Sequence, residues 1–115
     1  MRRDSIMQPE YPWKGRNDPE SRCYATGRMG CNDFHHIFEG ISGYKRISEE
    51  QGLWCYLDHD VHMRAHSCQR PYETLLLDLR KLAQAKWETN MVRAGSTRSE
   101  ARDAWMLMMG KSWLQ

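Results

Sequence analysis

Apolar residues recur at helical spacing in the second half of the chain, a pattern typical of helices that bury one face. After Pro71, residues 72 to about 89 carry an apolar stripe made of Leu75, Leu76, Leu79, Leu82, Ala83 and Trp87. A last helix is predicted to begin at Ser96 or Thr97, because residues 97–100 (Thr-Arg-Ser-Glu) fit a capping box, and to run toward Gly110. Its Trp and Met residues indicate a core or a partner-facing surface.

Two short strands are predicted before these helices. Residues 34–38 place aromatic and apolar side chains around a pair of histidines, and residues 53–57 form an aromatic and apolar run between Gly52 and Asp58. Asp58 stands where a helix N-cap belongs. A short helix is therefore predicted over residues 59–67.

Glycines punctuate the chain around these strands. Residues 39–43 (Glu-Gly-Ile-Ser-Gly) are predicted to be a loop, and residues 48–52 resemble one helical turn ended by glycine. Gly27 and Gly30 suggest a tight turn or knuckle within residues 21–31. The resulting order, strand, loop, strand, short helix and two packing helices, predicts an α+β fold.

The first 20 residues are predicted to be an extended or poorly ordered arm. They contain Pro9, Pro12 and Pro19, and proline fixes the backbone and removes a hydrogen-bond donor. Tyr11 and Trp13 could dock this arm onto the body. Residues 21–115 are then expected to form one domain.

Composition limits the function classes. No apolar run approaches the roughly 20 residues that span a bilayer, and residues 1–7 have no apolar stretch typical of a secretion signal. A cytoplasmic protein without membrane contact is expected. The net charge of +2 does not by itself indicate nucleic acid, but 17 Lys and Arg residues could still gather on one face.

All five histidines lie between residues 35 and 66, and histidine is the commonest metal ligand. His62 and His66 are four residues apart, so on a helix they project from the same face. His35 and His36 are adjacent on a strand and point to opposite sides, so that one can reach an ion while the other faces elsewhere. The strand pair and the helix pair are nevertheless expected to converge on one cation. His59, between two aspartates, is as compatible with solvation as with a functional role.

The four cysteines are Cys23, Cys31, Cys55 and Cys68. In a reducing compartment and beside a histidine cluster, metal ligation or burial is favoured over a disulfide set. Cys55 lies in the apolar run of the second strand and is expected to belong to the core.

Several segments together resemble the small HNH-type proteins of phages and prophages, over residues 21–115. Those proteins carry a His-His-x-Phe motif, a basic segment ending in Ser-Glu-x-x-Gly-Leu, a Leu before a cysteine knuckle, and a final His. They also carry a Gln-x-x-Phe-Glu helix end and a Phe-Met-x-x-Phe-Gly-Lys-x-Tyr-Leu tail. The corresponding stretches here are residues 35–40, 45–53, 56–57, 62–66, 82–88 and 105–114.

The resemblance implies a ββα-metal fold and a DNA endonuclease that uses one divalent ion (Zn, Mg, Mn or Ni). His36 would be the general base, and the ion would be held by His35, His62 and His66. Lys45, Arg46 and Arg64 would lie near the phosphates of DNA. Phage origin and action in the host cytoplasm are implied as well.

The chain departs from this family at its structural zinc. The relatives carry two Cys-x-x-Cys pairs, whereas here Thr26 replaces the second thiol of the first pair, and Asp58 and Val61 stand at the other pair. A four-ligand zinc site cannot form at those positions. Either the zinc was lost and packing replaced it, leaving Cys23 and Cys31 as buried thiols or a labile disulfide, or these two cysteines recruited Asp58 or His59.

Three functions are therefore compatible with the sequence. The first is an endonuclease or nickase. The second is a catalytically inactive protein of the same fold that binds nucleic acid as a recombination accessory. The third is a protein-binding inhibitor of a host nuclease or defence complex, which would use the Trp and Met residues of the last helix as its contact surface.

Overall fold

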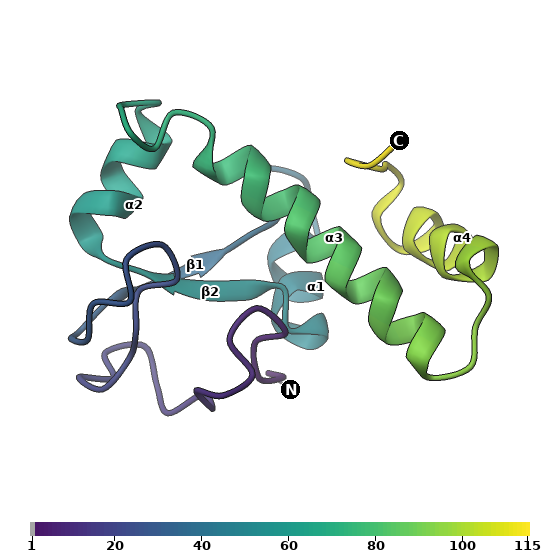
Figure 1. The fold of residues 1–115 in the computed structure, drawn as a ribbon, viewed down its shortest axis with the longest axis horizontal. Helices are drawn as coiled ribbons and strands as arrows, with labels where there is room; N and C mark the ends of the chain where they lie inside the picture. Colours follow the sequence, from purple (N-terminus) through teal and green to yellow (C-terminus); the bar gives the residue numbers. More distant parts are fainter. Residues whose placement is uncertain (1) are drawn as a thin grey trace.

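A computed structural model describes residues 2–115 of the chain. Its elements follow the order β1 (Asp33–His36), α1 (Tyr44–Gln51), β2 (Trp54–Leu57), α2 (His59–His66), α3 (Leu75–Arg93) and α4 (Arg98–Met109). Helices α2 and α4 lie at opposite ends of the molecule, with α3 running between them (Figure 1). The predicted α+β class, a short β-hairpin and helix packed by two C-terminal helices, is confirmed.

The two strands pair antiparallel, with Asp33 opposite Leu57, Phe34 opposite Tyr56, His35 opposite Cys55 and His36 opposite Trp54. Because successive side chains of a strand point to opposite faces, each face has its own composition. One face carries Phe34, His36, Trp54 and Tyr56, and the other carries Asp33, His35, Cys55 and Leu57. All four residues of β2 are buried, so both faces are covered.

The N-terminal segment, predicted to be an extended or poorly ordered arm, lies against the body and covers the aromatic face. Residues 2–20 contain no helix or strand, but Ser5, Met7 and Gln8 are buried. Trp13 packs edge-on against Phe34 and Trp54, with ring centroids 5.0 and 5.5 Å apart. The docking suggested for Trp13 is thus present, whereas Tyr11 stays exposed.

The same segment also satisfies the free edge of β2. The Gln8 side-chain oxygen accepts a hydrogen bond from the Tyr56 backbone N–H at 2.9 Å, and Gln8 Nε2 donates to the Arg22 carbonyl at 2.7 Å. The Tyr56 carbonyl accepts from the Tyr24 N–H at 2.8 Å. Pairing these groups leaves no open β2 edge at Tyr56 for another chain.

Helix α1 is longer than the single turn predicted. It starts directly after Gly43 and ends at Gln51, directly before Gly52, and both glycines have left-handed backbone conformations. The Tyr44 hydroxyl donates to the Met109 carbonyl at 2.6 Å, and the Ser48 hydroxyl donates to the Phe38 carbonyl at 3.0 Å. These contacts with distant residues stabilise α1, whose local sequence signals only where the helix ends.

Helix α3 begins three residues later than predicted. It continues past Thr89 to Arg93, because neither glycine nor proline occurs between Leu75 and Gly95. Of the predicted stripe, Leu79, Ala83 and Trp87 are buried, but Leu82 is 45% exposed.

The buried face of α3 also includes two polar residues, Gln84 and Glu88. Gln84 Nε2 donates to Glu88 Oε2 at 2.7 Å, and Gln84 Oε1 accepts from the Trp113 N–H at 2.7 Å. Arg102 Nε donates to Glu88 Oε2 at 2.8 Å. This satisfied network ties α3 to α4 and to the C-terminal residues.

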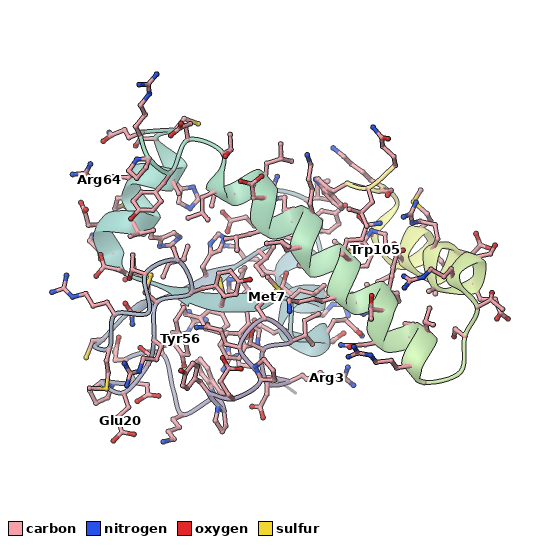
Figure 2. All side chains as sticks on the ribbon, viewed as in Figure 1. Arg3, Met7, Glu20, Tyr56, Arg64 and Trp105 are labelled. Atoms are coloured by element: carbon pink, nitrogen blue, oxygen red, sulfur yellow. The ribbon has the colours of Figure 1, made fainter. Side chains whose placement is uncertain are left out.

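The capping box of α4 is present as predicted. Glu100 N–H donates to Thr97 Oγ1 at 3.0 Å, and Thr97 N–H donates to Glu100 Oε1 at 2.8 Å. Trp105 points into the core beside α3 (Figure 2), whereas Leu107 is 91% exposed. Trp105 therefore belongs to the core. The large exposed apolar residues of α4 are Met106 and Leu107.

No helix within residues 2–115 is long and apolar enough to cross a membrane.

The docking of the N-terminal segment predicts unequal effects at two glycines that cap helices. Gly52 and Gly110 have φ angles of +71° and +75°, but a Cβ at Gly52 would collide with the Asp4 carbonyl oxygen, whereas at Gly110 it would meet nothing within 4 Å. Gly110→Ala should cost about 1 kcal/mol of unfolding free energy for the left-handed backbone alone. Gly52→Ala should cost at least about 2 kcal/mol, because the segment must move as well. Guanidinium denaturation of both variants measures this, and equal costs would contradict the docked segment.

Candidate metal centre

Three imidazoles meet where the polar face of the hairpin contacts α2. His62 and His66 lie one turn apart on α2, and their Nε2 atoms are 3.2 Å from each other. The His35 ring centroid is 4.9 Å from that of His62 and 6.0 Å from that of His66. One ring nitrogen of each residue lies within 4.8 Å of the other two. The structure thus brings together the three residues predicted to hold an ion.

His35 supplies the buried part of this cluster. The residue is 3% exposed, and its Nε2 has no hydrogen-bond partner. Burial, with the nearby His62 and His66 rings, lowers the pKa of His35 to about 3. The imidazole is therefore neutral at physiological pH and keeps a free lone pair, which is the form that binds metals. A buried nitrogen without a partner costs roughly 1–3 kcal/mol, a cost that a bound cation would remove.

Helix α2 is positioned by its N-cap. The Asp58 side chain accepts from the Asp60 N–H at 3.1 Å, which starts the helix directly after β2. A helix that begins so close to the strand carries His62 and His66 back over the face that holds His35. The site is thus built from two neighbouring elements and one tight connection.

Asp33 is a site residue that the sequence analysis did not single out. Its Oδ2 atom accepts hydrogen bonds from His59 Nδ1 at 2.8 Å and from His62 Nδ1 at 3.0 Å. Partial burial raises the pKa of Asp33, but the hydrogen bonds from His62 and His59 outweigh it and hold this pKa below its ordinary value. The available signal was its position two residues before His35, which places both side chains on one face of β1.

The fourth expected imidazole does not join the cluster. His36 lies on the aromatic face, with its ring 4.9 Å from that of Phe34 and its Nε2 3.4 Å from Glu49 Oε2. The expectation of four converging imidazoles is therefore wrong, because consecutive strand residues face opposite sides.

Glu49 is the charged neighbour of His36 and also pairs with Arg2 from the N-terminal segment. Burial lowers the pKa of His36, and Glu49 offsets this effect only in part. Partial burial raises the pKa of Glu49, but Arg2 and His36 beside it bring that pKa below its ordinary value. The result is a neutral imidazole next to an ionised carboxylate.

The residues considered for an altered zinc site are dispersed. Cys23 is buried beside Cys55, whereas Cys31 is exposed with its Sγ 3.7 Å from the Asn17 carbonyl, and all four cysteines are free thiols. Asp58 caps α2 and His59 contacts Asp33. Within residues 2–115, the His35, His62 and His66 trio is the only group of three or more His, Cys, Asp or Glu close enough to share an ion.

The basic residues predicted to meet DNA differ in their surroundings. Arg46 pairs with Glu50 at 3.1 Å on α1, and Arg64 pairs with Asp60 at 2.9 Å on the outer side of α2 (Figure 2). Lys45 is exposed and has no ion pair within residues 2–115. Lys45 is thus the most available of the three cations.

Comparison with known proteins adds no relative to this description. No protein-family model matches the chain, and neither a curated protein nor a solved structure matches it. The resemblance to HNH-type proteins stays an interpretation of the sequence, and functional inferences depend on the geometry described above.

The buried neutral His35 predicts how stability changes with pH in the metal-free protein. The pKa of His35 is about 3 in the folded protein, against 6.5 for an ordinary histidine. Between these pH values the unfolded chain therefore binds a proton that the folded protein does not. The contribution of neutral His35 is complete above the ordinary pKa and is lost as the pH falls toward the folded one. His35→Phe, which keeps a planar ring, should therefore reduce the slope of the unfolding free energy against pH by up to about 1.4 kcal/mol per pH unit.

Guanidinium denaturation with chelator present, in steps between about pH 4 and pH 8, measures this slope. Above the ordinary histidine pKa the two proteins should show the same pH dependence. Identical slopes at lower pH would show that His35 is not held neutral in the folded state.

Proposed function

We propose that this protein is a metal-dependent endonuclease of the HNH type, which hydrolyses phosphodiester bonds of DNA with one divalent ion. The observation that carries the proposal is the buried His35 Nε2, which lacks a partner beside the two α2 imidazoles. A purely structural core rarely leaves a ring nitrogen buried and unsatisfied. The arrangement, a hairpin histidine opposite two histidines of the next helix, also agrees with the resemblance found in the sequence.

The donor set fits a transition-metal ion. His35, His62 and His66 offer three nitrogen ligands, and three protein ligands with open positions are typical of catalytic rather than structural zinc sites. Imidazole suits zinc and nickel, whereas Mg²⁺ prefers oxygen ligands and fits this set least well. When bound, such an ion would supply charge stabilisation for the phosphate and the leaving oxygen.

His36 is the proposed general base. Its pKa is lowered, so the imidazole is neutral, but its Nε2 is buried on the face opposite the trio, so it could accept a proton only from a water that reaches that face. The Glu49 carboxylate lies 3.4 Å from His36 Nε2, and Arg2 holds Glu49 on its other side. An ionised carboxylate so placed stabilises the imidazolium that forms when His36 takes up a proton. Activity in the host cytoplasm of a phage or prophage belongs to the same proposal.

Titration of the chelator-treated protein with Zn²⁺ or Ni²⁺ tests the centre. We expect one ion per chain, and we expect His62→Ala and His66→Ala each to weaken binding by at least about 10-fold because a ligand is lost. His59→Ala is the matched control, since His59 lies outside the trio, and it should retain one ion. Absence of binding, or equal loss in all three variants, would refute the centre.

Cleavage of supercoiled plasmid tests the chemistry. With Mn²⁺, Ni²⁺, Zn²⁺ or Mg²⁺ supplied in turn, we expect nicked or linear product, with Mg²⁺ least effective. His36→Ala should lower the rate roughly 10²–10⁴-fold, the usual contribution of a general base. Its metal stoichiometry should not change, which separates loss of the base from loss of the ion.

One observation favours the second candidate, a catalytically inactive DNA-binding protein. His36 packs on Phe34 on the face opposite the trio. An inactive protein would bind DNA without cutting it, and affinity would fall with salt because phosphate contacts release counterions. Lys45→Ala should then reduce the slope of log affinity against log salt concentration by the amount expected for about one phosphate contact. Arg64→Ala should change this slope less, since Arg64 is paired with Asp60.

A further inference from the structure

We propose that Asp33 is the positioning residue of the histidine centre, holding His62 in the tautomer whose Nε2 lone pair faces the ion. The inference rests on the proposed metal centre. Asp33 would supply no ligand atom itself, but it would set the orientation of His62, which does.

The hydrogen-bond geometry determines the tautomer. A carboxylate only accepts hydrogen bonds, so the 3.0 Å contact between Asp33 Oδ2 and His62 Nδ1 places the ring proton on Nδ1. A neutral imidazole carries one ring proton, which leaves His62 Nε2 with a lone pair. That atom is 3.2 Å from His66 Nε2 and belongs to the cluster that includes His35.

The backbone places Asp33 where it can do this. Asp33 pairs with Leu57, the last residue of β2, and α2 begins two residues later at His59. His59 and His62 are three residues apart, so they share one side of the first helical turn. The carboxylate at the start of β1 therefore meets both rings.

His59 contributes by restraining Asp33 from the solvent side. Its side chain is 73% exposed, whereas that of His62 is 14% exposed, and both donate to the same Asp33 oxygen. Removing His59 leaves the contact between Asp33 and His62 in place. The positioning effect should therefore depend on Asp33 much more than on His59.

Long-range ¹H–¹⁵N NMR of the histidine rings tests the tautomer without any metal. At about pH 8, where an ordinary histidine is neutral, we expect the His62 proton on Nδ1 in the wild-type protein and in His59→Ala. In Asp33→Ala the proton should redistribute toward Nε2. An unchanged His62 tautomer in Asp33→Ala would overturn the inference.

Competition with a chelator for Zn²⁺ provides the second measurement. Loss of an outer partner of a metal-binding histidine typically weakens affinity 10–100-fold, and we expect this for Asp33→Ala. Asp33→Asn keeps an acceptor oxygen without the charge and should recover part of the affinity. Asp60→Asn is the matched control, because it removes a carboxylate of α2 that pairs with Arg64 and should bind like the wild type.

Each outcome has a distinct meaning. Wild-type affinity in Asp33→Ala would overturn the positioning role. Equal loss in the Asn and Ala variants would also overturn it, in favour of direct coordination by Asp33. If the wild-type protein binds no Zn²⁺, the proposed centre fails, whereas the NMR experiment still decides whether Asp33 sets the His62 tautomer. Thermal melting of the metal-free variants verifies that each one folds.

Discussion

The register of the β1–β2 pair is the constraint on which the other features depend. Pairing His35 with Cys55 and His36 with Trp54 assigns every side chain of the hairpin to one of two faces. A shift of one residue would exchange the faces. His35 would then point toward the aromatic cluster, and Phe34 would face α2. The histidine cluster and the core thus follow from one set of backbone hydrogen bonds.

Covering both faces makes so small a sheet stable. A two-stranded hairpin with four residues per strand is marginal in water by itself. Here the N-terminal segment packs Trp13 on one face and satisfies the β2 edge through Gln8. Helix α2 covers the other face, with Val61 and Ala65 buried. Because the hairpin is held from both sides, the backbone that carries His35 is rigid, as the proposed metal site requires.

The centre combines a local cost with partners that define its geometry. Burial of an unpaired His35 nitrogen disfavours folding, and the protein retains it beside two further imidazoles. Asp33 and the Asp58 cap act around this position through ordinary hydrogen bonds. Such local violations of the rules for a satisfied core are expected at functional sites. On the opposite face, Glu49 and Arg2 give His36 a separate charged environment.

The sequence by itself determined both strands, the last three helices and the shared helix face of His62 and His66, because helical spacing, N-caps and strand alternation are local properties. Of α1 it signalled only the end. It also indicated that His35 and His36 point apart. Only the tertiary structure decided that Gln8 and Trp13 join the core, that Asp33 binds His62, and that Cys23 and Cys31 lie in different environments. These contacts join residues far apart in the chain, where no periodicity specifies a partner; Asp33 and His62 are 29 positions apart, and Gln8 and Tyr56 are 48 apart.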